Sequence, residues 1–421
     1  MAAEVPSQAP QTYGFPLYPE LPQSGSDLIP LPQRVNGPKL KPFDFQGSQQ
    51  IEFLDYLGEG LHSHVIKVKI LGQIYALKLF MFSSEMDWGG PPLSAQYDKS
   101  NRVEATIFCE YLDPFNNECR AFGRLHESGH PELAVECYGY VLLDEDHERA
   151  LRDRFPGREL KSLFQDDSGR RRQDFLTKDG KPPPIRAVVK EFGSGVDKLR
   201  DRQLSKTLKD IIQLQELGII GIDVAKRQLI NGKLCDFSIA MTTPHFGMNP
   251  EMHPHLTPLG KARLEFDIFL FSVHDYVIFD EMVDEWNEDH RLQKDQVSVR
   301  ALHQLYGSDR WTYNLRKTAS RERVFTHVDP RLYDWRAPAR GRDESSAGGQ
   351  TNGQSSKGSG SGRSVAKVSK TRRQSKKPPR WYYEGSEEHK AKLRMSRRCG
   401  TYFEWVFKRG FFIPTLSPRY P

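Results

Sequence analysis

Residues 53–82 alternate between apolar and polar side chains, as strands with one buried face do. Lys67 and Lys69 are interleaved with isoleucine and valine, which gives a two-residue period. The dipeptide Leu71-Gly72 interrupts the run where a turn between two strands would fall. The pattern predicts consecutive β-strands over this range.

Three later segments are predicted to be mostly helical, the first two because their apolar residues fall on one face of a helix. The first spans 116–126, the second contains Leu204 and Leu208 and ends at Gly218, and the third spans 261–288. Together with the strands, these helices predict an α+β protein.

Segments 135–143 and 186–192 are rich in valine and aromatic residues, which favour strands. Residues 229–238, with the sequence LINGKLCDFS, have the form of a hairpin around Asn231-Gly232. The intervening stretch 144–184 is dense in charged residues, and we expect an insertion too polar to belong to the core.

Composition divides the chain into four parts. Nine prolines among residues 1–45 predict a disordered arm. Residues 46–335 form the predicted folded domain, with insertions at 83–115 and 144–184. Residues 336–380, poor in apolar side chains and rich in glycine and serine, predict a flexible linker. Ten aromatic residues in 381–421 predict a segment that docks on the rest of the molecule.

The net charge of +6 is unevenly distributed. Residues 340–380 carry eleven Lys or Arg and two Asp or Glu, so the remainder of the chain is mildly acidic. This basic linker is consistent with nuclear import, with nucleic-acid contact or with simple solvation. The five cysteines are at least ten residues apart, which favours reduced thiols. No apolar run reaches 18 residues and no signal peptide opens the chain, so we expect no membrane partner.

A glycine-containing turn and a strand lysine form the first candidate site. In the sequence LGEGLHSHV, Gly58 and Gly60 would let the backbone approach phosphate oxygens closely. Lys78 follows one strand later, where an ammonium group could bind the same phosphates. Taken alone, each feature is also consistent with an ordinary hairpin and a solvated lysine.

Two aspartates and a glutamine after the second helix form the second candidate site. Asp223 lies in the loop that follows this helix and could accept a proton from a hydroxyl group. Gln228 follows five residues later and Asp236 thirteen residues later, a spacing suited to holding magnesium.

The stretch GIIGIDVAKRQLINGKLCDFSIAMTTPHF resembles the Fta-two family of fungal kinetochore subunits, and the ordered motifs resemble the protein-kinase superfamily. The resemblance covers residues 43–245 and a helical remainder. It implies a protein-kinase-like bilobal fold, with an antiparallel N-terminal sheet and a reduced helical C-terminal lobe. It also implies ATP and Mg²⁺ as cofactors, kinetochore subunits as partners and a nuclear location.

The kinase resemblance assigns roles to individual residues. Lys78 would bind phosphates and pair with Glu118, for which Glu110 is the alternative. Asp223 would be the catalytic base, with Lys226 in its loop. The remaining implied contacts are metal binding by Asp236 and Gln228 and nucleotide binding by Gly58, Gly60, Ser63, Val65, Ala76 and Phe192.

Several positions depart from the kinase pattern. Gly221-Ile222 replaces His-Arg, Ala225 replaces a lysine, Gln228 replaces an asparagine and Ser238 replaces the glycine of Asp-Phe-Gly. These departures favour a nucleotide-binding protein with weak or absent phosphotransfer. An active atypical Ser/Thr protein kinase and a kinetochore scaffold without nucleotide are the alternatives.

Three histidines, His245, His253 and His255, are close together near Glu251. Their spacing fits no common metal-binding pattern. We expect surface residues there.

Overall fold

The computed structural model describes residues 38–81, 111, 113–157, 160, 163, 184–245, 247–249, 258–293, 295–301, 328–335, 403–408 and 411–416. Residues 1–37 of the predicted arm and the whole basic linker lie outside these ranges, so their disorder stays a prediction. The C-terminal residues are described as two strands, β10 (Phe403–Lys408) and β11 (Phe411–Leu416), which form a separate hairpin. The docking predicted for 381–421 falls outside what is described.

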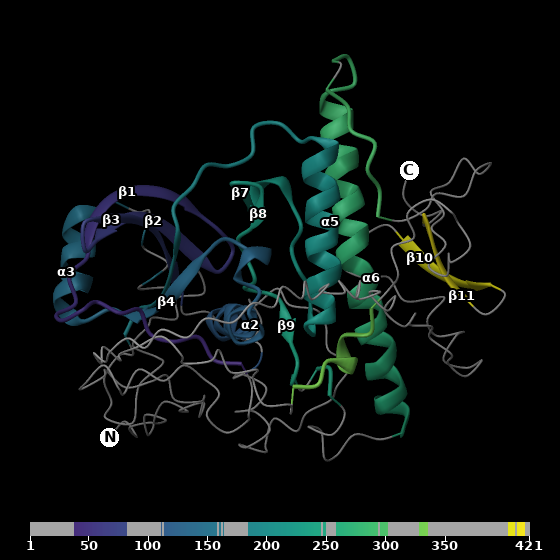
Figure 1. Cartoon of the computed structure of the whole chain (residues 1–421), viewed down its shortest axis with the longest axis horizontal. Coiled ribbons are helices and arrows are strands. Elements are labelled where there is room, and N and C mark those ends of the chain that lie inside the picture. The colour runs from purple at the N-terminus through teal and green to yellow at the C-terminus, as the bar shows by residue number, and fades with distance from the viewer. Residues whose placement is uncertain are drawn as a thin grey trace, which may run out of the picture.

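A five-stranded antiparallel sheet forms one side of the molecule (Figure 1). Its order is β1-β2-β3-β5-β4, and the strands are β1 (Glu52–Glu59), β2 (Ser63–Ile70), β3 (Gln73–Phe80), β4 (Cys137–Leu142) and β5 (Arg186–Glu191). The strands predicted from the sequence are therefore confirmed. The apolar and polar side chains of β2 alternate in burial as predicted: Ile66 and Val68 are buried, and Lys67 between them is partly exposed.

Helix α3 (Glu145–Arg154) corrects the prediction for 144–184. This segment was expected to be too polar for the core, yet Leu151 is fully buried in a cluster with sheet residues such as Val68 and Leu77. Leu160 and Leu163 join the same cluster. The high overall polarity hid a helix that needs apolar residues on one face only.

Three longer helices complete the described core, one of them next to the sheet and the other two farther from it (Figure 1). They are α2 (Pro114–Ser128), α5 (Asp201–Glu216) and α6 (Pro258–Asp289), and they confirm the three predicted helices. The largest apolar cluster joins all three helices to the sheet, with Phe122, Leu208 and Tyr276 among its members. No helix within the described ranges is long and apolar enough to cross a membrane.

Short strands connect these helices. β6 (Ile219–Ile220) pairs with β9 (Met241–Thr242), and β7 (Leu229–Ile230) pairs with β8 (Lys233–Leu234) as the predicted hairpin. A 3-10 turn, η5 (Lys226–Gln228), precedes β7. Asp223 and Asp236 lie in the two loops that these strands frame.

Residues 38–43, here called the strap, show that the folded part begins earlier than residue 46. Leu40 is 1% exposed, and Phe43 donates its backbone N–H to the carbonyl oxygen of Tyr140 in β4 at 2.9 Å. Tyr140 in turn donates to the carbonyl oxygen of Lys41 at 3.1 Å. The strap therefore covers the outer edge of β4, a position in which prolines are tolerated.

The strap rests directly on Gly123 in the middle of α2. A Cβ atom at this position would lie 2.6 Å from the backbone carbon of Lys39. We expect Gly123→Ala to destabilise the protein by about 1–3 kcal/mol, because the backbone of the strap must shift. That cost outweighs the gain of about 1 kcal/mol that alanine brings to a helix interior.

Urea denaturation of both proteins measures this effect. Gly195→Ala is the matched control, because a Cβ there meets nothing within 4 Å. A Gly123→Ala variant more stable than the wild type would show that the strap does not lie on α2.

Candidate functional site

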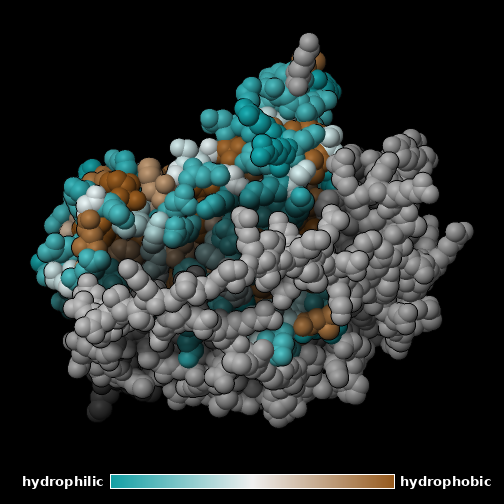
Figure 2. Space-filling view, viewed as in Figure 1, coloured by the Kyte–Doolittle hydropathy of each residue, from teal (hydrophilic) through white to brown (hydrophobic). Residues whose placement is uncertain are grey.

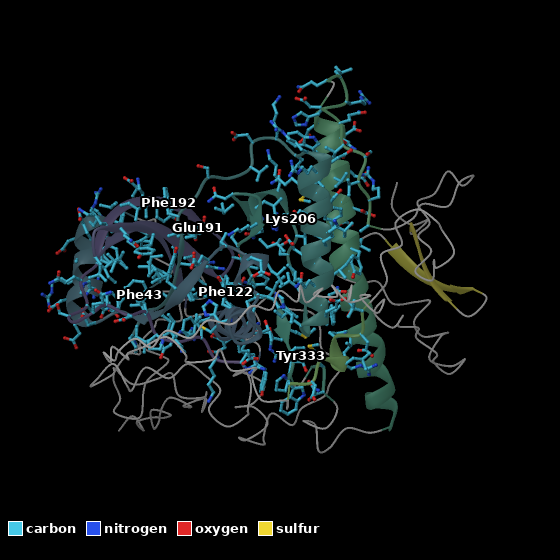
Figure 3. All side chains as sticks on the ribbon, in the orientation of Figure 1. Phe43, Phe122, Glu191, Phe192, Lys206 and Tyr333 are labelled. Atoms are coloured by element: carbon cyan, nitrogen blue, oxygen red, sulfur yellow. The ribbon has the colours of Figure 1, made fainter. Side chains whose placement is uncertain are left out.

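Lys78 is buried between the sheet and the helices. It lies on β3, opposite Val65 of β2 and Val188 of β5, and is 3% exposed. Its Nζ atom donates to Glu118 Oε2 of α2 and to Asp236 Oδ1, each at 2.6 Å. In Figure 3, Phe122 marks α2, and Glu191 with Phe192 marks the end of β5. The structure thus brings together a strand, a helix and a loop that are distant in sequence.

Glu118 is the glutamate that contacts Lys78, and its side chain is fully buried. The sequence had left Glu110 as an alternative, and that residue lies outside the described ranges. The other oxygen of Glu118, Oε1, accepts a hydrogen bond from Lys190 Nζ at 2.5 Å. One carboxylate is therefore shared between two ammonium groups.

Lys190, on β5, was missed by the sequence analysis. It is 6% exposed, and its Nζ atom also donates to the carbonyl oxygen of Cys235 at 2.7 Å. Asp236, Lys78, Glu118 and Lys190 form a line of alternating charges, here called the charge chain. The sequence signal for Lys190 is that it directly follows the apolar run 187–189 in a predicted strand.

The charge chain fixes the protonation of Asp236 and Lys78. Burial alone would raise the pKa of Asp236, but Lys78 and then Lys190 hold it well below its ordinary range, helped by the backbone N–H of Ser238 at 2.9 Å. Burial would likewise lower the pKa of Lys78, but Asp236 and Glu118 raise it above its ordinary value. Asp236 is therefore ionised and Lys78 is charged at neutral pH.

Gln228 links the two aspartates of the second candidate site. Its Nε2 atom donates to Asp223 Oδ2 and to Asp236 Oδ2, each at 3.3 Å. Arg227 also donates to Asp223 Oδ2 at 2.5 Å. Lys226 is placed differently, because it is exposed and its Nζ atom lies 4.8 Å from the ring centroid of Trp286. The structure joins Asp223, Gln228 and Asp236 but does not bring Lys226 to them.

The predicted nucleotide contacts on β2 and β3 share one face of the sheet. Val65 is opposite Lys78, and Ala76 is opposite Lys190, so all four side chains are on the same side. At the end of β1, Gly58 has φ +152°, and a Cβ on it would meet nothing within 4 Å.

The turn beyond Gly58 is closed by its own backbone. Gly60 donates its N–H to the carbonyl oxygen of Ser63 at 2.8 Å, and Ser63 itself is buried. Two exposed apolar side chains flank this glycine turn in sequence, with Leu57 46% and Leu61 73% exposed, and Phe192, which follows β5, is 38% exposed. Figure 2 shows apolar surface over the sheet, whereas the helical end is mostly hydrophilic.

Asn231, in the turn between β7 and β8, fixes the chain after β5. Its Nδ2 atom donates to Glu191 Oε1 at 2.9 Å, and its Oδ1 atom accepts from the backbone N–H of Ser194 at 3.2 Å. Its own N–H donates to the carbonyl oxygen of Ser194 at 2.9 Å. The chain that follows β5, which begins with the predicted nucleotide contact Phe192, is therefore held against the β7–β8 hairpin.

Two buried arginines hold α2 in place, and neither was predicted. Arg120 donates to the carbonyl oxygens of Thr242, at 3.0 Å, and Pro244. Arg124, one turn later, donates to the carbonyl oxygens of Leu217, at 2.7 Å, and Thr243. Because both arginines are on the helix that carries Glu118, they fix that carboxylate relative to the chain after Asp236.

Asp275 of α6 holds the loop that leads to Asp223. Its Oδ1 atom accepts from the backbone N–H of Ile222 at 2.7 Å, and its Oδ2 atom accepts from Gln215 Nε2 at 2.9 Å. Gln215 Oε1 in turn accepts from the hydroxyl of Tyr276 at 2.7 Å. Burial raises the pKa of Asp275 to about 7, despite these donors.

The raised pKa of Asp275 predicts a pH dependence of stability. In the unfolded chain its pKa is about 4, so between about pH 4 and pH 7 the folded state holds the extra proton. The stabilisation is complete below this window and is lost as pH rises through it, with a slope of up to about 1.4 kcal/mol per pH unit. Asp275→Asn cannot titrate and should lack this slope. Urea unfolding of both proteins at pH 5, 6 and 7 measures the difference, and parallel profiles would contradict the prediction.

His245 corrects the expectation of a surface histidine cluster. It is fully buried, its Nδ1 accepts from the backbone N–H of Gly247 at 3.0 Å, and its Nε2 lies 2.8 Å from the carbonyl oxygen of Tyr111. Nε2 therefore carries the proton, which makes this histidine neutral. His253 and His255 lie outside the described ranges. Within those ranges no group of three or more His, Cys, Asp or Glu could hold a metal ion.

A family model described as kinetochore Sim4 complex subunit FTA2 matches residues 28–241, about half of the chain. This range contains the five-stranded sheet, α2, α5 and all members of the charge chain. No curated protein matches the chain.

Proposed function

Because the chain belongs to the FTA2 family of kinetochore Sim4 complex subunits, we propose that it is a kinase-like, nucleotide-binding subunit with weak or absent phosphotransfer. Family membership implies protein partners within a kinetochore complex and a nuclear, chromosomal location. The remaining parts of the proposal rest on the geometry around Lys78.

A kinase-like fold is supported by the order and contacts of the elements. The strands of the antiparallel sheet precede the helices α5 and α6 in the chain. A lysine on β3 pairs with a glutamate on α2, the helix that follows β3. A loop aspartate, Asp223, and a second aspartate, Asp236, follow in the order that kinases use. In that fold the nucleotide lies between the sheet and the helices.

The observation that carries nucleotide binding is the position of Lys78. Its ammonium group is held by Glu118 and Asp236 on the same sheet face as Val65 and Ala76. At Gly58, where a Cβ would meet nothing within 4 Å, phosphate oxygens could approach the backbone closely. Leu57 and Phe192 offer exposed apolar surface to a base, as concave ligand sites commonly do.

The residues around Gln228 fit a magnesium ion. Mg²⁺ prefers oxygen ligands and keeps several waters when it binds phosphates. Asp236 Oδ2 and Asp223 Oδ2 both face Gln228, and a rotation of the Gln228 amide would add its oxygen. The ion would supply positive charge that offsets the charge of the phosphates. Asp236 and Gln228 would hold it.

Three features support weak phosphotransfer. Asp223, the proposed base, is ion-paired with Arg227 at 2.5 Å, so its Oδ2 atom is already occupied by a guanidinium group. Lys226 lies over Trp286 of α6 and away from the aspartates. Gly221-Ile222 precedes Asp223 in place of His-Arg, so the arginine that would bind a phosphorylated loop is missing from this position.

A scaffold without nucleotide is the second candidate, and the charge chain favours it. Its two lysines and two carboxylates balance each other, and each lysine already has two acceptors. Buried charges satisfied in this way can persist for structural reasons, because removal of one member leaves an unpaired charge.

Calorimetric titration of the full chain with ATP separates the two candidates. We expect a dissociation constant below 1 mM, an affinity of at least about 4 kcal/mol. Lys78→Met should weaken binding at least tenfold, because the ammonium group contacts the phosphates directly. Lys69→Met, which removes an exposed lysine from the neighbouring strand, is the control and should bind as the wild type does.

No detectable ATP binding at millimolar concentration would leave the scaffold as the function. Phosphotransfer is followed separately with radiolabelled ATP. Asp223→Asn should keep its ATP affinity and abolish whatever phosphotransfer the wild type has, since a base does not hold the nucleotide.

A further inference from the structure

Lys190 is in a position to act on a bound nucleotide together with Lys78. The two lysines are on the same face of adjacent strands, because Lys190 is opposite Ala76 and Lys78 is two residues from Ala76. Both ammonium groups donate to the same carboxylate, that of Glu118. They therefore lie within one ion-pair network.

Lys190 changes the charge balance of the site. Without it, Lys78 alone would face Glu118 and Asp236, which leaves one uncompensated negative charge near the position of the phosphates. With it, the charge chain is neutral. Asp223 does not alter this balance, because Arg227 is paired with it at 2.5 Å. A negatively charged site repels a triphosphate, and in kinases a bound metal ion offsets this repulsion.

Lys190 also reduces the free energy that is lost when Lys78 exchanges its bond to Glu118 for one to a phosphate. When Lys78 donates to a phosphate oxygen, Glu118 keeps its bond to Lys190 and is not left as an unpaired buried charge. The bond from Lys190 to the carbonyl oxygen of Cys235 holds the residue next to Asp236 at the same time. Asp236, the other carboxylate of the charge chain, is therefore kept in position without a metal ion.

We propose that Lys190 supplies, from within the protein, the positive charge that a divalent cation would otherwise bring, so that a nucleoside triphosphate binds here without magnesium. This inference rests on the proposed nucleotide-binding function. It assigns to Lys190 a binding role beyond the structural one that its ion pair already explains.

ATP binding measured by calorimetry in excess EDTA and in excess Mg²⁺ tests the inference. For the wild type we expect dissociation constants that agree within about threefold in the two conditions. Lys190→Met should bind at least tenfold more weakly in EDTA, and Mg²⁺ should restore most of the loss. Lys190→Arg keeps the charge and should stay independent of the metal. Lys209→Met removes an exposed lysine of α5 and should match the wild type.

The outcomes separate the inference from the function on which it rests. Wild-type binding that needs Mg²⁺ would overturn the role of Lys190 while leaving nucleotide binding in place. Equal metal dependence in Lys190→Met and the wild type would also overturn it. If the wild type binds ATP in neither condition, the nucleotide-binding function itself is wrong. Circular dichroism would show whether Lys190→Met folds. If it does not, ATP binding by the wild type and by Lys190→Arg in EDTA and in Mg²⁺ still tests the inference.

Discussion

Glu118→Gln should lower the free energy of unfolding by about 3–5 kcal/mol, because it removes the counterion shared by two buried lysines. Glu118 accepts from Lys78 at 2.6 Å and from Lys190 at 2.5 Å, and all three side chains are nearly inaccessible to water. The charge chain would change from neutral to a net charge of +1. Urea denaturation at neutral pH measures the loss.

Two further variants test this explanation. Glu145→Gln removes an exposed carboxylate at the start of α3 and should cost no more than about 0.5 kcal/mol. Glu118→Gln combined with Lys190→Met restores the charge balance and should be less destabilised than the sum of the single changes. Simple additivity would show that the two residues do not act through their shared ion pair.

Asp113→Asn should destabilise the protein by a similar amount, about 3–5 kcal/mol. Asp113 is the N-cap of α2, where its Oδ1 atom accepts from the backbone N–H groups of Phe115 and Asn116 at 3.0 and 3.2 Å. The same carboxylate accepts two hydrogen bonds from the buried Arg186, at 2.9 and 3.1 Å. Asparagine keeps the cap but places an amide NH₂ group against the guanidinium group.

Asp144→Asn is the matched control, because Asp144 is the N-cap of α3 and accepts from the backbone N–H of His147 at 2.8 Å. Asparagine and aspartate cap helices about equally well, so this change should cost less than about 0.5 kcal/mol. Thermal unfolding followed by circular dichroism compares the two variants. Equal and small effects of the two substitutions would mean that the buried Arg186 does not need the charge of Asp113.

The strands and helices that carry the site could be predicted because their patterns are local. The alternation around Lys67 and the spacing of Leu204 and Leu208 each report one buried face, whatever the rest of the chain does. The same holds for the hairpin at Asn231-Gly232, where both residues have positive φ. The choice between Glu118 and Glu110 could not be made from a local pattern, because it depends on the path of the chain between β3 and α2.

The residues that the sequence analysis missed have partners far along the chain. Lys190 is 72 positions from Glu118, and Arg120 is 122 positions from Thr242. No periodicity connects residues at such distances. His245 was misjudged for a related reason, because a short histidine-containing loop is polar in composition, whereas its burial depends on Tyr111.

The two arginines on α2 should be more strongly conserved in this family than the residues that accept their hydrogen bonds. Arg120 and Arg124 donate to backbone carbonyl oxygens, which every residue type possesses. The bonds therefore survive a change of side chain at Thr242 or Leu217 but not the loss of either guanidinium group. Related sequences should keep arginine at both positions of α2 while the residues that accept these bonds differ from one relative to another.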